Sequence, residues 1–418
     1  MKLGVMSDLH LGLRQYGLEE RENDFYEQYE RAIQVFVDND VDLVIIGGDV
    51  FDKPRPSPKA LESFSKGLKK LNSNGIEVVN IIGNHAMVQA PGFVTADEFF
   101  TTVFDSVGNY MLLDTYQHYF KNGVCVMGLP YYHNFKLDDF KNTVAKMNEE
   151  VASLNSDVNI LVLHQAFKEF CGFTGEDFSI TELELSNFDL VICGHIHERK
   201  LVDRGDYIFL QPGSIERLSV AEARDEEQQG KGVYIINTDN FTIDSVANGF
   251  IPLRSPRLFC ISDMYMNSAE DIVDIENEIT SFCNTCQEQP LVFLTVHDVS
   301  NSFQRLVNLT NDLRGTCLTV NFNYIDESIQ VTNPFSEEGI IMGVTEALKI
   351  ALNPLDEDDA RLGMDLYNNL KDGKDVSEML EEYRLKRKPN VESLEDKGFC
   401  QDEVDDLIQE VLEFIGEI

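Results

Sequence analysis

Short apolar runs alternate with longer amphipathic segments through the first part of the chain. The amphipathic segments at residues 23–37 and 58–71 carry apolar positions at helical spacing and are predicted to be helices. The apolar runs, rich in Val and Ile, predict strands at residues 3–6, 41–46, 77–82, 124–127, 159–163, 189–193, 207–210 and 232–236. Because these strands are apolar almost throughout, we expect sheets buried on both faces, in a layered α/β domain spanning residues 1–250.

The pattern changes near residue 251. Residues 251–332 predict a smaller αβ domain, with strands at 258–262, 291–296 and 317–323 and a helix at 271–283. Beyond residue 333 a helix is predicted at 337–352, and the chain ends in an amphipathic helix with apolar residues at Val404, Leu407, Ile408, Val411, Leu412 and Ile415. We therefore expect a helical tail over residues 333–418, which either packs on its own domain or docks on a partner.

The composition narrows the class of protein. No run of about 18 apolar residues occurs, so no membrane-spanning helix is expected. The N-terminus lacks the features of a signal peptide, and the eight cysteines are scattered over 418 residues, unlike those of a small secreted domain. These features predict a cytoplasmic protein.

The charge changes the expected ligand. The formal net charge is −39, from 73 acidic and 34 basic residues. Nucleic-acid binding usually depends on Lys and Arg contacts to phosphate, so this charge argues against a polyanionic ligand. Bound divalent cations or a partner subunit can supply positive charge that the formal count omits. The candidate functional residues must therefore decide whether the chain binds a polyanion.

Potential metal ligands follow several predicted strands directly. Five of the eight histidines lie at these strand ends, in the segments Asp8-Leu9-His10, Gly48-Asp49-Val50-Phe51-Asp52, Gly83-Asn84-His85, His164 and Gly194-His195-Ile196-His197. In open α/β sheets, ligands bind beyond the carboxyl ends of the strands, so these residues are expected to converge. In Asp-x-His and His-x-His, alternate residues of an extended segment point to the same side.

This set of residue types suits two divalent metal ions, because carboxylate, imidazole and amide oxygen together bind Mn, Fe or Zn. We expect Asp49 to bridge the two ions. One site would be completed by Asp8, His10 and His197, and the other by Asn84, His164 and His195. His85 directly follows a ligand and can face the substrate, where it would protonate the leaving oxygen or stabilise charge on the phosphate.

The order of these motifs resembles the calcineurin-like metallophosphoesterase superfamily over residues 1–200. Two further segments are similar to the SbcD branch of DNA-repair nucleases: Pro54-Arg55-Pro56-Ser57-Pro58 after Asp52, and Gln211-Pro212-Gly213-Ser214-Ile215-Glu216-Arg217. The resemblance implies a metallophosphoesterase β-sandwich flanked by helices, a small domain that caps the DNA-binding face, and a helical tail that binds an SMC-like coiled-coil ATPase of the SbcC type. It also implies a homodimer with manganese-dependent exonuclease and endonuclease activity on double-stranded DNA ends.

One position departs from this branch. The residue after Gly-Asn-His is usually acidic there, but here it is Ala86. All the ligand positions remain filled, and we expect Asp52 to orient His85 in place of the missing carboxylate.

Two other functions remain open. The metal ligands alone also fit a phosphatase or a cyclic-nucleotide phosphodiesterase, although neither needs a capping domain and a tail. A non-catalytic assembly subunit would keep the fold and bind little metal. The chain has no Gly-x-x-x-x-Gly-Lys-Ser/Thr phosphate loop, so any ATP dependence would come from the partner.

Overall fold

The computed structural model describes residues 1–87, 94–104, 109–133, 136–171, 178–224, 230–300, 302–313 and 315–326. The chain divides into two units, Met1–Ser328 and Ile329–Ile418, and every described residue belongs to the first. The predicted tail over residues 333–418 lies outside the described residues.

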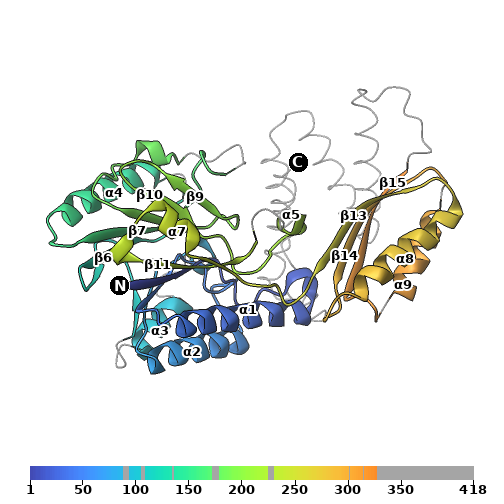
Figure 1. Ribbon diagram of the computed structural model, residues 1–418, viewed down its shortest axis with the longest axis horizontal. Coiled ribbons are helices and arrows are strands. Elements are labelled where there is room, and N and C mark those ends of the chain that lie inside the picture. The colour runs from blue at the N-terminus through green and yellow to red at the C-terminus, as the bar shows by residue number, and fades with distance from the viewer. Residues whose placement is uncertain are drawn as a thin grey trace, which may run out of the picture. The chain divides into compact units, whose positions relative to one another are not determined.

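Two six-stranded sheets form the larger part of this unit (Figure 1). The first sheet contains, in spatial order, β12 (Phe250–Pro252), β11 (Gly232–Asn237), β1 (Lys2–Met6), β2 (Leu43–Ile46), β3 (Glu77–Asn80) and β4 (Tyr110–Leu112). The second contains β5 (His118–Lys121), β6 (Val124–Leu129), β7 (Val158–His164), β8 (Leu190–Gly194), β10 (Ile208–Gln211) and β9 (Lys200–Asp203). The central strands β1–β4 and β6–β7–β8–β10 run parallel, whereas β11, β12, β5 and β9 join antiparallel, so both sheets are mixed.

The apolar strands are explained by burial on both faces. In β2, Leu43 and Ile45 belong to the core between the two sheets, while Val44 and Ile46 pack toward the helices on the other face. Successive side chains of a strand alternate between faces, so a strand buried on both sides is apolar at every position. The expected layered α/β architecture, with sheets flanked by helices, is confirmed.

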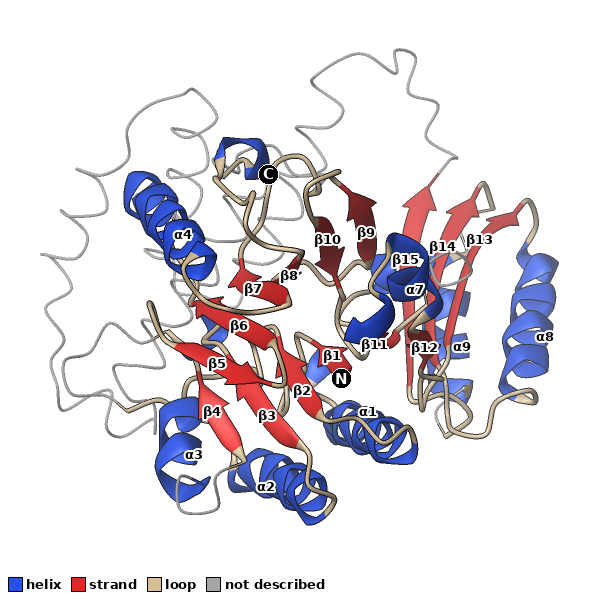
Figure 2. Ribbon diagram, turned by 60° about the vertical axis from the view of Figure 1, so that its left-hand side comes forward, coloured by secondary structure: helices blue, strands red, loops and turns tan. Residues whose placement is uncertain are grey.

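Helices cover the outer faces of the two sheets (Figure 2). The first sheet is covered by α1 (Glu19–Asp38), α2 (Pro58–Ser73) and α3 (Ala96–Phe104), and the second by α4 (Leu137–Ala152). Two short helices, α5 (Val220–Arg224) and α7 (Ile243–Asn248), lie in later connections. Helix α1 begins at Glu19 rather than at residue 23, because polar residues of its first turns are buried in ion pairs that the apolar pattern does not reveal.

A third sheet lies in the region expected to form the small domain. Its strands β13 (Phe259–Met266), β14 (Leu291–Asp298) and β15 (Thr319–Asp326) are all parallel. Apolar residues of one face pack against α8 (Ile272–Cys283) and α9 (Phe303–Asp312). Among the described residues, no helix is long and apolar enough to span a membrane.

Candidate metal centre

Strand register brings the candidate ligands to one place. Met6 pairs with Ile46 and Ile46 with Asn80 in the first sheet, while His164 pairs with Gly194 in the second. The segments after β1, β2, β3, β7 and β8 therefore start at the same edge of their sheets. Four candidate ligands have positive φ angles just beyond these strands: Asp8 (52°), His10 (44°), Asp49 (47°) and His195 (89°). Such strained backbone clusters at functional sites, where the surrounding structure maintains it.

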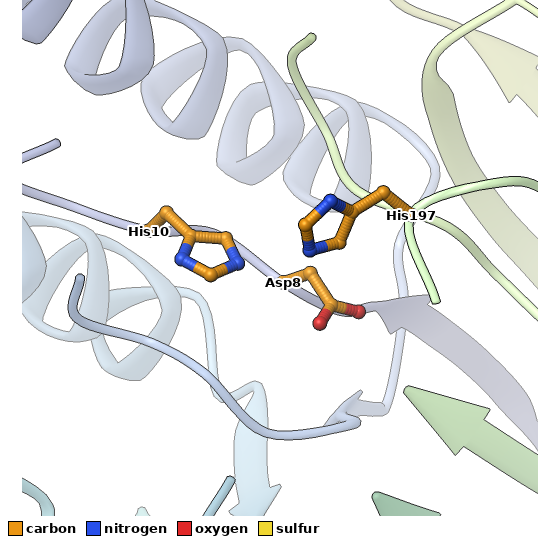
Figure 3. A group of neighbouring side chains, drawn as sticks. All are labelled: Asp8, His10 and His197. Carbon is orange, nitrogen blue, oxygen red and sulfur yellow. The ribbon is translucent and has the colours of Figure 1, made fainter. Parts of the chain in front are cut away.

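Asp8, His10 and His197 form the first cluster, which we call the His10 group; their ligand atoms lie within 4.8 Å of one another. Figure 3 shows the three side chains converging, with His197 entering from a different part of the chain. The Asp8 carboxylate accepts a hydrogen bond from the His195 backbone N–H at 3.0 Å. His10 is fully buried, and neither of its ring nitrogens has a hydrogen-bond partner. A buried imidazole with two orphaned nitrogens is well suited to a metal ion.

Asp49, His164 and His195 form the second cluster, also within 4.8 Å, and Asn84 joins them to complete what we call the His164 group. Asn84 Oδ1 lies 3.0 Å from His164 Nε2 and 2.8 Å from His195 Nδ1, and Asp49 Oδ2 lies 3.1 Å from His164 Nε2. The other ring nitrogen of His164 lies 2.7 Å from the Gly47 carbonyl oxygen. That contact favours a proton on Nδ1 and leaves Nε2 available as a ligand.

Glycine is required where the backbone passes these ligands. A Cβ atom at position 83 would lie 2.1 Å from Asp49 Oδ1, and one at position 48 would lie 2.4 Å from His164 Nδ1. Gly48 also has a φ of +99°, which side chains rarely permit. Each residue lets the backbone approach a ligand closely, as expected for glycines placed just after strands.

His85 lies beside both Asp52 and the His10 group. Its ring is 4.6 Å from the His10 ring, and its side chain is 37% exposed, so it can reach a substrate. Its Nδ1 lies 2.7 Å from the Asp52 main-chain carbonyl oxygen but 3.9 Å from the Asp52 carboxylate. The carboxylate is slightly closer to His10, at 3.7 Å. Asp52 therefore contacts His85 chiefly through its backbone, a detail that the side-chain types could not indicate.

Two residues that sequence reasoning missed hold His197 in place. Oε1 of Glu222, a residue of α5, lies 3.4 Å from His197 Nδ1. The other carboxylate oxygen, Oε2, pairs with Lys231 Nζ at 2.5 Å. Lys231 also donates to the His197 carbonyl oxygen at 2.9 Å and to Ser214 Oγ at 2.7 Å. A carboxylate on the distal nitrogen of a ligating imidazole fixes the ring and strengthens it as a donor. The only sequence signal was their proximity to the Gln211–Arg217 segment.

Burial and the surrounding charges shift the pKa values of the ligands in different directions. Burial tends to lower the pKa of His164, but the Asp49 carboxylate outweighs burial and raises it to about 9. Burial opposes ionisation of Asp49 too, yet His164 holds the pKa of that carboxyl below its usual range. Burial, reinforced by His164, lowers the pKa of His195 to about 4, and burial also lowers the pKa of His10. The centre thus combines ionised carboxylates with two imidazoles, those of His10 and His195, that stay neutral near neutral pH. His164 holds an extra proton beside Asp49, which a divalent cation bound there would displace.

Comparison with known proteins agrees with this geometry. The family model described as calcineurin-like phosphoesterase matches residues 1–199. The "DNA double-strand break repair protein Mre11" of Methanococcus maripaludis is 28% identical over 81% of this chain and 88% of its own length. The protein of the same name from Saccharolobus solfataricus is 25% identical over 90% of this chain and 96% of its own.

This chain is similar to metallophosphoesterases of the Mre11/SbcD type over most of its length. The similarity to the Saccharolobus protein extends well beyond the matched family model, so it includes the third sheet as well as the two larger ones. The His10 and His164 groups supply Asp and His residues that could hold divalent metal ions.

The remaining histidines are placed differently. His118 is exposed on β5, and His297 lies on β14 stacked on Tyr265. His133 lies closer to the centre, because its ring contacts Tyr131, whose ring is 5.5 Å from that of His195. Tyr131 therefore lies beside the ligands, although no motif singled it out.

Proposed function

We propose that this protein is a DNA nuclease subunit that hydrolyses phosphodiester bonds at double-strand ends, as a manganese-dependent exonuclease and endonuclease. The observation that supports this most is a direct contact between the two ligand groups. The backbone N–H of His195, in the His164 group, donates to the carboxylate of Asp8, in the His10 group. Two ions held so closely can activate water and stabilise both oxygens of a displacement at phosphorus. The relatives' name, DNA double-strand break repair protein, favours DNA as the substrate.

Each side chain has a separate role in this proposal. Asp8, His10 and His197 would hold one ion, and Asn84, His164 and His195 would hold the other, with Asp49 available to both. His85 is oriented through its Nδ1 by Asp52, so its outer nitrogen is directed away from the scaffold. There it donates a proton to the departing oxygen.

Substitution of His85 tests this assignment. His85→Ala should lower manganese-dependent cleavage of duplex ends by about 10²–10⁴-fold, the usual contribution of general acid–base catalysis. Both ions should remain bound by elemental analysis, because His85 is not a ligand. Undiminished cleavage would refute the role of His85.

Efficient turnover of a small phosphoester without DNA cleavage would instead indicate a phosphatase or cyclic-nucleotide phosphodiesterase. An intact fold with little bound metal would indicate an assembly subunit.

The partners follow from the same proposal. We infer a cytoplasmic homodimer in which residues 1–250 form the nuclease domain and residues 251–332 cap the DNA-binding face. Residues 333–418 would bind the coiled coil of an SbcC-type ATPase. Removing residues 340–418 should abolish co-purification with such an ATPase while sparing manganese-dependent cleavage, and a complex of unchanged yield would contradict this.

A further inference from the structure

A cavity of about 530 Å³ lies beside the metal centre and has no role in the proposal above. It is lined by Met87, by residues 130–133 after β6, and by one face of α4. Its volume falls within the range of about 300–1,000 Å³ that is common for small-molecule sites. It can therefore accept a group of nucleotide size, whereas a duplex is far too wide to enter it.

Tyr131 connects the cavity with the metal centre. Its ring lies 5.5 Å from the His195 ring and 6.4 Å from the His164 ring, so the same side chain borders both the His164 group and the cavity. The loop is fixed by two backbone contacts: Tyr131 N–H donates to the Ile82 carbonyl oxygen at 3.0 Å, and Tyr132 N–H donates to Gln165 Oε1 at 3.3 Å. A group in the cavity would therefore adjoin a phosphate at the centre.

The lining suits one unit of a nucleic-acid strand. Lys136 and Lys146 are exposed along the cavity, with Asp139 as the one acidic residue in its lining. This balance is opposite to that of the chain, which has 73 acidic and 34 basic residues. Lysine ammonium groups bind phosphate as point charges, and aromatic rings such as Tyr131 and His133 offer surfaces on which a base can stack.

We propose that this cavity binds the nucleotide next to the scissile phosphate on a single DNA strand, with its phosphate near the two lysines. This proposal rests on the proposed nuclease function and adds the direction in which one strand leaves the centre. It explains how a strongly acidic protein provides local positive charge where a polyanion must pass.

The test uses the full chain and compares Lys136→Gln/Lys146→Gln with Lys141→Gln. Lys141 lies on α4, as Lys146 does, but pairs with Glu182, which does not line the cavity. Its substitution controls for the loss of one positive charge from the same helix. Affinity for a single-stranded oligonucleotide is measured by fluorescence anisotropy in Ca²⁺ at several salt concentrations. Turnover of bis(p-nitrophenyl) phosphate, which has no neighbouring nucleotide, is measured in Mn²⁺.

The double variant should bind the oligonucleotide about tenfold more weakly. The slope of the logarithm of its binding constant against the logarithm of salt concentration should become less steep by about 0.7, for the one phosphate that the two lysines contact. The control variant should match the unaltered chain, and all three should hydrolyse the small diester equally. Equal strand affinity in the double variant and the unaltered chain, or an equal loss in the control, would overturn the proposal. Strand binding is measured without cleavage, so failure of the nuclease function would be recognised separately.

Discussion

The two ligand groups differ in how far the polypeptide alone organises them. In the His164 group, the donors already contact one another, since Asn84 Oδ1 lies within 3.0 Å of two imidazole nitrogens and Asp49 pairs with His164. In the His10 group, both nitrogens of the buried His10 ring lack a hydrogen-bond partner, although the Asp52 carboxylate lies 3.7 Å from Nδ1. An unsatisfied buried polar group costs about 1–3 kcal/mol. The His10 group therefore gains more from a bound cation, and it depends more on outside support such as Glu222.

Substitution of Asp49 tests whether the two groups act as one centre. If Asp49 bridges them, Asp49→Ala should remove both ions and lower phosphodiesterase activity by at least about 10³-fold, or roughly 4 kcal/mol. Asp8→Asn should weaken only the ion in the His10 group. Elemental analysis of each purified variant gives the number of bound ions. One ion retained in full by Asp49→Ala would show that the groups are independent.

Asp97, which lies behind the His164 group, should make the stability of the folded chain depend on pH. This carboxyl is fully buried beside Asn80, and burial raises its pKa to about 7. The folded chain therefore holds a proton that the unfolded chain releases near pH 4. The contribution of Asp97 to the free energy of unfolding should therefore fall as pH rises from about 4 to 7 and stay level above that range.

Asp97→Asn should remove this pH dependence and stabilise the chain at pH 8 by about 2–4 kcal/mol, since one pKa unit corresponds to about 1.4 kcal/mol. Near pH 4 the two proteins should be equally stable. Urea unfolding in the presence of EDTA at both pH values measures this difference without a contribution from bound metal. Parallel stability curves for the two proteins would contradict the assignment.

The smallest expected effect concerns support of the His10 group by Glu222. Glu222→Ala should weaken one of two manganese sites by about 10–100-fold, which is usual when the partner of a ligating histidine is lost. Glu198→Ala removes the same charge from an exposed position near His197 and serves as the control. Manganese titration followed by electron paramagnetic resonance resolves the two sites. If both sites weaken equally, or neither does, the His10 group does not depend on Glu222 more than the His164 group does.

The strand-end rule predicted that the candidate ligands lie close together, and it could do so because it depends on local features. Asp8 and Asn84 come after apolar strands and His164 ends one, and parallel strands present their carboxyl ends at one edge. The edge strands β4, β5, β9 and β12 were not predicted, because they are short and less buried. Glu222 and Lys231 were missed for a different reason. They belong to no motif, and their contacts with His197 arise only from folding of the connection after β10.

The sequence by itself determined the fold class and the resemblance to a family, and it placed the candidate donors at strand ends, since these depend on residue type and position along strands. The tertiary structure decided which other groups contact the candidate donors. It showed that His85 is held by the Asp52 carbonyl oxygen rather than chiefly by its carboxylate, and that Tyr131 links the centre to a cavity. Asp8 and His197 are neighbours because the two separate sheets pack with the ends of β1 and β8 close together. Such alignment depends on packing between distant segments, which no local pattern records.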